Sequence, residues 1–80
     1  MGGELLEAYN SKLDAAHAVA AALHTSHYEG LMITLFAAGL DKVALKSKAC
    51  AIKSKMKALG ILASAHPLLV KRLDDAVFLR

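Results

Sequence analysis

Apolar residues recur every three or four positions along most of the chain, which is the spacing of helices that bury one face. The charge pattern changes between residues 15 and 40, where Glu29 is the one charged residue. A polar segment, Thr25–Gly30, interrupts this uncharged stretch. We therefore expect two buried helices, Glu4–Ser26 and Tyr28–Ala38, joined by a turn.

The two predicted helices differ in their apolar surface. The first has a stripe with alternating steps of three and four residues: Leu6, Tyr9, Leu13, Ala16, Ala20, Leu23 and His27. The second, Tyr28–Ala38, is apolar all round, which is typical of a helix in the middle of a bundle. We expect this second helix to be the most buried element of the fold.

Capping signals define a third helix. Gly39 suits the left-handed position that ends one helix, and Asp41 suits the N-cap of the next. That next helix is predicted over Lys42–Leu59, and Gly60 provides a second left-handed end. Its core stripe is Leu45, Ala49, Ile52, Met56 and Leu59.

A short turn or single helical turn over Ile61–Ala65 separates this helix from the last one. Pro67 is favoured at the first position of a helix and holds His66 outside the helical region. The last helix is predicted over Pro67–Phe78. The inward face of this helix is Leu69, Val70, Leu73, Ala76 and Val77, and Phe78 points away from it.

These elements predict an all-α, small single-domain helical bundle of four to five helices. Eighty residues suit one domain, covering residues 1–80, in which residues 1–3 resemble an added leader or a frayed start. The chain is 56% hydrophobic, and one residue in five is alanine, so helices can pack closely instead of through bulky side chains. A membrane span is not expected, because His24, His27 and Glu29 would lie near the bilayer centre.

Lysines form the strongest polar signal. Six of them lie on the third predicted helix, and the formal net charge of the chain is +3. Such a helix attracts phosphates, acidic lipids or acidic protein surfaces, although lysine stems also cover the edges of ordinary amphipathic helices. We take one flank of this helix and the off-stripe aromatic residue as a candidate interaction surface: Lys42, Lys46, Lys53, Lys57 and Phe78.

Motifs for catalysis are missing from the sequence, and we expect no enzyme, cofactor or metal. The single cysteine, Cys50, excludes an intrachain disulfide and suits a reducing cytoplasm. His24 and His27 are one helical turn apart, and only His66 or Glu29 could add a third metal ligand.

The predicted function is therefore a non-enzymatic helical bundle that serves protein–protein interaction or self-association, or an artificial scaffold without an evolved function. One alternative is weak, salt-sensitive anion binding by the lysine-rich helix. A second alternative is a metal or cofactor site at the histidines.

Overall fold

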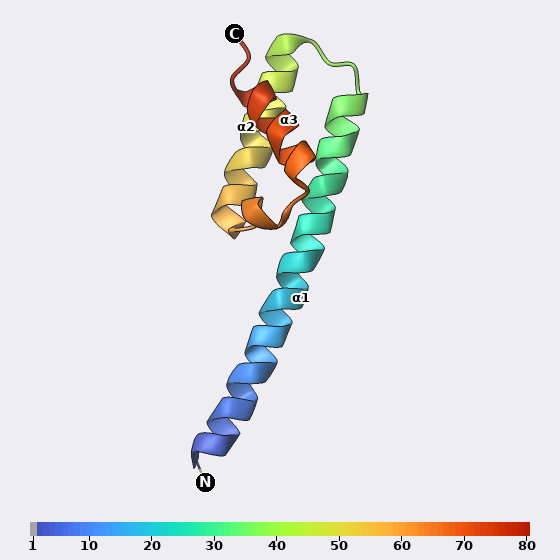
Figure 1. The fold of residues 1–80 in the computed structure, drawn as a ribbon. Coiled ribbons are helices and arrows are strands. Elements are labelled where there is room, and N and C mark those ends of the chain that lie inside the picture. The colour runs from blue at the N-terminus through green and yellow to red at the C-terminus, as the bar shows by residue number, and fades with distance from the viewer. Residues whose placement is uncertain (1) are drawn as a thin grey trace.

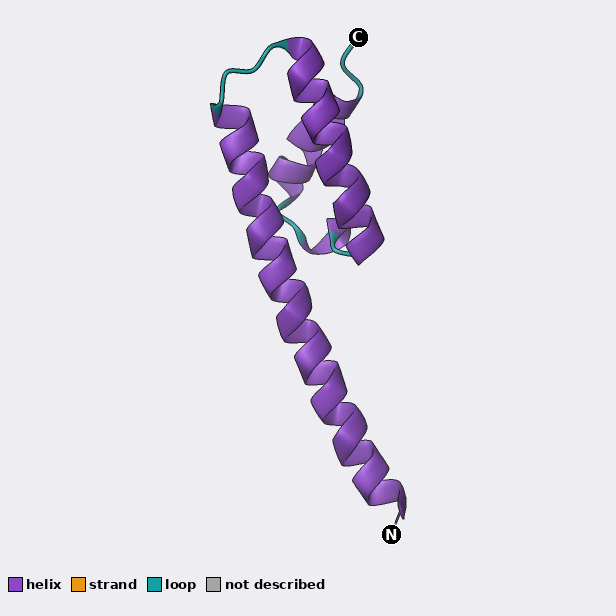
Figure 2. Ribbon diagram, turned by 180° about the vertical axis from the view of Figure 1, so that it is seen from behind, coloured by secondary structure: helices purple, strands orange, loops and turns teal. Residues whose placement is uncertain are grey.

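The described part of the chain folds into three α-helices and one short 3-10 helix. The computed structural model describes the backbone of residues 2–80 and the side chains of residues 12 and 14–80. The elements are α1 (Gly2–Ala37), α2 (Lys42–Leu59), η1 (Leu62–Ser64) and α3 (Pro67–Val77), and they are arranged as Figures 1 and 2 show. The all-α prediction is confirmed, whereas the prediction of four to five helices is wrong.

The difference lies in α1, which runs straight through the predicted turn at Thr25–Gly30. Polar side chains there are accommodated without breaking the helix, because the Thr25 hydroxyl donates to the Ala21 carbonyl at 2.8 Å. Among the described residues, positive φ angles occur only at Gly39 and Gly60, so Gly30 keeps a helical backbone. Since no proline intervenes, nothing in this segment interrupts the hydrogen-bond ladder.

The capping predictions for α2 are confirmed. Gly39 has φ 65°, and the Asp41 carboxylate accepts a 2.8 Å hydrogen bond from the backbone N–H of Ala44. At the other end, Gly60 has φ 69°, and the N–H of Ile61 donates to the Met56 carbonyl at 3.1 Å. These bonds satisfy backbone groups that helix ends leave unpaired.

Hydrogen bonds within α3 and to α1 hold the start of α3 in place. Pro67 occupies the first turn, and His66 precedes it with φ −57° and ψ 127°, as predicted. The His66 ring nitrogen Nδ1 accepts from the N–H of Leu68 at 3.2 Å. The N–H of His66 donates to Oε2 of Glu29, on α1, at 2.9 Å. A carboxylate is favourable here because the N-terminal end of a helix is partially positive.

The core lies where α1, α2, η1 and α3 meet. Its buried residues are Met32, Leu35, Ala49, Met56, Ile61, Ala65, Leu73 and Ala76. The prediction that Tyr28–Ala38 is the most buried helix is wrong: this segment is the end of α1, and Ile33 within it is 58% exposed. The physical reason is that α1 has packing partners on one side only.

The first half of α1 extends away from the other helices. We call Gly2–Ala20 the arm, and the rest of the chain the head. The molecule measures 61 × 19 × 17 Å, and its Cα radius of gyration is 16.9 Å. A compact domain of this length would have a radius of about 12 Å. Figure 1 shows the arm projecting from the head. Within residues 2–80, no helix combines the length and apolar character needed to cross a membrane.

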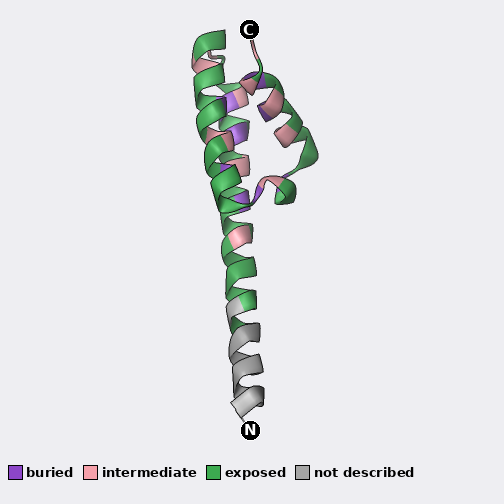
Figure 3. Ribbon diagram, turned by 90° about the vertical axis from the view of Figure 1, so that its left-hand side faces the viewer, coloured by how far each residue is buried: buried purple, intermediate pink, exposed green. Residues whose placement is uncertain are grey.

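The stripe predicted to face the core does not do so. Ala16, Ala20, Leu23 and His27 are all exposed, and Figure 3 shows that most of the described part of α1 is exposed. Leu6, Tyr9 and Leu13 lie outside the residues whose side chains the structure describes.

Candidate functional site

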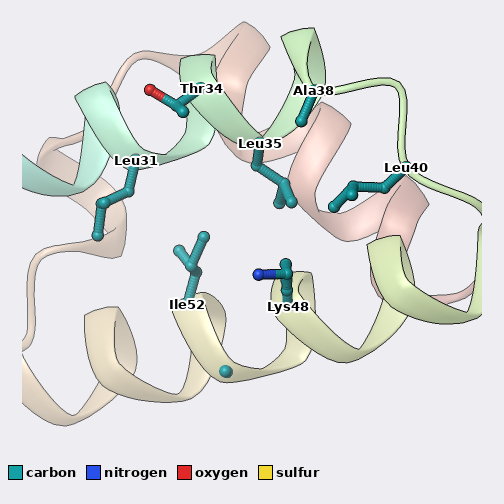
Figure 4. Close-up of a pocket in the computed structure, with 8 residues that line it drawn as sticks. Leu31, Thr34, Leu35, Ala38, Leu40, Lys48 and Ile52 are labelled. Atoms are coloured by element: carbon teal, nitrogen blue, oxygen red, sulfur yellow. The ribbon is translucent and has the colours of Figure 1, made fainter.

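An apolar groove lies between the C-terminal half of α1 and α2. Its cavity volume is about 370 Å³. In Figure 4, Leu31 and Leu35 of α1 project toward Ile52 of α2. The complete lining is Leu31, Thr34, Leu35, Ala38, Leu40, Lys48, Ala51 and Ile52. We call this feature the α1–α2 groove.

Small side chains keep the groove open. Ala38 and Ala51 line it, and an alanine fills much less of the space between two helices than a leucine would. The lining comes from α1, the following loop and α2, whereas α3 packs elsewhere on the same two helices. Lys48 is the one charged residue of the lining. The groove can therefore bury an apolar surface and offer one cation to it.

The groove continues into the exposed apolar face of the arm. The residues Ala16, Ala20, Leu23, His27, Leu31, Thr34 and Ala38 follow one another in steps of three or four, and every one of them is exposed. We call this row the α1 stripe. At about 100° per residue, the row from Ala16 to Thr34 lies on one face of α1, and Ala38 follows directly after the end of this helix. That face is about 120° around the axis from Ala21, Thr25, Tyr28 and Met32, which turn toward the head.

The predicted lysine surface is partly occupied within the chain. Lys53 Nζ lies 2.8 Å from Oδ1 of Asp74 and 5.4 Å from the ring centroid of Phe78. Lys46 Nζ donates to the Leu79 carbonyl at 2.8 Å. Two of the four lysines therefore connect α2 to the end of α3, which weakens the anion-binding alternative.

The other members of the predicted surface are solvent-facing. Phe78 is 73% exposed, as its position off the α3 stripe predicted. Lys42 and Lys57 are exposed near opposite ends of α2. The structure therefore brings Lys53 and Phe78 together but spreads the remaining lysines along the helix.

The candidate metal ligands do not gather. His24 and His27 are exposed on α1, where the His27 ring packs edge-to-face on Tyr28 at 5.2 Å. His66 caps α3. Among the side chains that the structure describes, no three His, Cys, Asp or Glu residues lie together as a metal site would need. Cys50 is exposed on α2.

None of the eight residues that line the α1–α2 groove was predicted as a site residue. For α1 a signal existed, because the steps of three and four that end at His27 continue through Leu31, Thr34 and Ala38. The predicted turn at Thr25–Gly30 divided this row into two helices and concealed its continuity. The α2 side of the groove had no comparable signal, because it depends on which helix packs beside α2.

Comparisons with models of protein families, with curated proteins and with solved structures find no match to this chain.

Proposed function

We propose that this chain is a non-enzymatic protein-interaction module that binds an apolar helix in the α1–α2 groove and along the α1 stripe. The observation that supports this proposal is that an uncovered apolar groove in the head continues as an exposed, uncharged face on the arm. Larger exposed apolar surfaces of this kind mark interaction sites on proteins.

The shape of the site favours a helix as its occupant. A groove between two helices accepts the apolar face of a third, with anchors three or four residues apart. Ala38 and Ala51 in the lining would let the backbone of such a helix approach closely. Burying apolar surface there would contribute about 25 cal/mol for each Å² removed from water.

The charge of the site sets a preference among partners. Because Lys48 lies in the lining, a helix with an acidic residue at one edge should bind better than one with a basic edge. The gain should be modest and should fall with added salt, because the pair would lie near the surface.

Peptide binding tests the proposal directly. The probe is a labelled helical peptide of about 20 residues, long enough to hold helical structure, with small apolar residues in steps of four and three and one acidic edge. Fluorescence anisotropy should show saturable binding to the protein. Ala51→Glu, which places a charge in the groove, should weaken binding about tenfold or more.

Ser54→Glu is the matched control, because Ser54 is exposed on α2 and lies outside the groove lining. It adds the same charge to the same helix and should leave peptide binding unchanged. Absence of binding, or equal loss with both variants, would contradict the proposed function.

A further inference from the structure

The α1 stripe is nearly symmetric about His27. Counting outward from His27, the next stripe positions come after four, seven and eleven residues in both directions. The residues at matching positions are also alike. They pair as Leu23 with Leu31, Ala20 with Thr34, and Ala16 with Ala38.

From this symmetry we propose that the helix that fills the α1–α2 groove is α1 of a second copy of this chain, which packs antiparallel on the α1 stripe with a twofold axis at His27. The inference rests on the proposed function and names its partner. In such a pair, Leu23 of each copy meets Leu31 of the other. Ala16 and Ala20 of each arm then lie in the groove of the other copy, opposite its Ala38 and Thr34.

The fit of side-chain sizes supports this arrangement. The groove lies between two helices, so a third helix enters it only if the side chains it presents are small. Ala16 and Ala20 are the small residues of the stripe on the arm. The antiparallel alignment places them in the groove of the other copy. The larger Leu23 meets Leu31 of the other copy at the end of the groove that lies nearer the axis.

The charges permit a second copy, although residues 15–28 offer no acidic partner to Lys48 of the groove. Residues 15–28 contain no Lys, Arg, Asp or Glu, so two copies of this segment meet without strong repulsion at neutral pH. An exposed, uncharged segment, residues 15–28, and an open apolar groove are both present in every chain. A single twofold contact covers the segment and the groove of each copy. No further copy can add to it, so the assembly stops at a dimer.

The surface area that the two copies would bury is large enough for a weak, specific contact. From Ala16 to Ala38 the stripe is about 33 Å long, and a helix is about 10 Å wide. Two such strips contribute about 700 Å², and the α2 walls of both grooves add to this area, which is in the range of weak, transient interfaces. We therefore expect a dimer that dissociates on dilution.

Sedimentation equilibrium of the full chain tests the dimer. The wild-type protein should be dimeric at high micromolar concentration. Ala20→Lys should raise the dimer dissociation constant at least about tenfold, because it brings a second positive charge into the groove that Lys48 lines. Ala18→Lys is the matched control: Ala18 is also exposed but lies on the opposite face of α1, so this variant should remain dimeric. Circular dichroism verifies that both variants stay helical.

Cross-linking tests the orientation in a Cys50→Ser background. His27→Cys should form a disulfide between copies, because the two positions meet at the axis. Ala16→Cys and Ala38→Cys chains should cross-link when mixed, and neither should cross-link by itself. A parallel pair would instead join Ala16→Cys chains to one another. That result would overturn the antiparallel arrangement.

The two proposals can fail separately. A wild-type chain that stays monomeric while its groove still binds the peptide would overturn the second-copy proposal and leave the proposed function standing. A dimer that Ala51→Glu does not weaken would show that the arms pair without entering the groove, and would also overturn the proposal. If the wild-type chain fails to bind the peptide at concentrations low enough to keep it monomeric, the proposed function fails too.

Discussion

Leu73 illustrates how much one side chain contributes to this small core. It is fully buried on α3, where the other core helices surround it. Leu73→Ala should lower the free energy of unfolding by about 2–5 kcal/mol, because it removes apolar contacts and leaves a cavity. Urea unfolding at a fixed protein concentration measures this loss.

The control for this prediction is the same substitution at Leu68, also on α3 but 67% exposed. Leu68→Ala should change the unfolding free energy by less than about 1 kcal/mol. Equal urea midpoints for the two variants would mean that α3 packs through a different face.

Glu29 connects α1 to α3 through a single side chain. Its carboxylate accepts the 2.9 Å bond from the N–H of His66, at the start of α3. Glu29→Gln keeps the shape and an acceptor oxygen but removes the charge. It should cost about 0.5–1 kcal/mol of unfolding free energy, because a negative charge at a helix N-terminus is stabilising.

Asp75→Asn provides the comparison for Glu29→Gln in urea unfolding, since Asp75 is exposed near the other end of α3. A negative charge is not favoured there, so this variant should be neutral or slightly stabilising. Losses of equal size in both variants would show that the contact with His66 contributes nothing.

At the scale of the element, α1 is one long helix, whereas the sequence predicted two helices joined by a turn. Gly30 lies inside α1, and a Cβ at this position would meet nothing within 4 Å. Gly30→Ala should therefore stabilise the protein by about 0.5–1 kcal/mol, because alanine is the better helix former. Thermal unfolding followed by circular dichroism measures the gain.

Gly39→Ala should have the opposite effect. Gly39 has φ 65°, so an alanine there adopts a left-handed backbone at a cost of about 1–2 kcal/mol, although space is available. If Gly30→Ala destabilised the protein as Gly39→Ala should, α1 would be broken at the predicted turn.

At the scale of the whole molecule, the arm determines the shape. Small-angle scattering on the monomeric Ala20→Lys chain should give a radius of gyration close to the 16.9 Å of the structure. A value near 12 Å, which is typical of a compact domain of this length, would show that the arm folds back on the head.

The sequence by itself determined the local features of this protein. Asp41, Gly39, Gly60 and Pro67 act within one helical turn of where they stand, so they located the ends of α2 and the start of α3. The apolar spacing of Lys42–Leu59 and of the last helix likewise predicted most of their buried residues. These signals depend on neighbours along the chain, and such neighbours are visible in a sequence.

Only the tertiary structure decided which face of α1 is covered. In a helix this rich in alanine, apolar residues line more than one face, and periodicity shows that a face is apolar without showing what packs on it. The head covers the face of Thr25 and Met32, and the α1 stripe stays exposed. The α1–α2 groove depends on the same choice, because it exists only where Ala51 of α2 lies beside Leu31 and Ala38. Contacts between residues far apart in the chain decide such a site, and no local pattern encodes them.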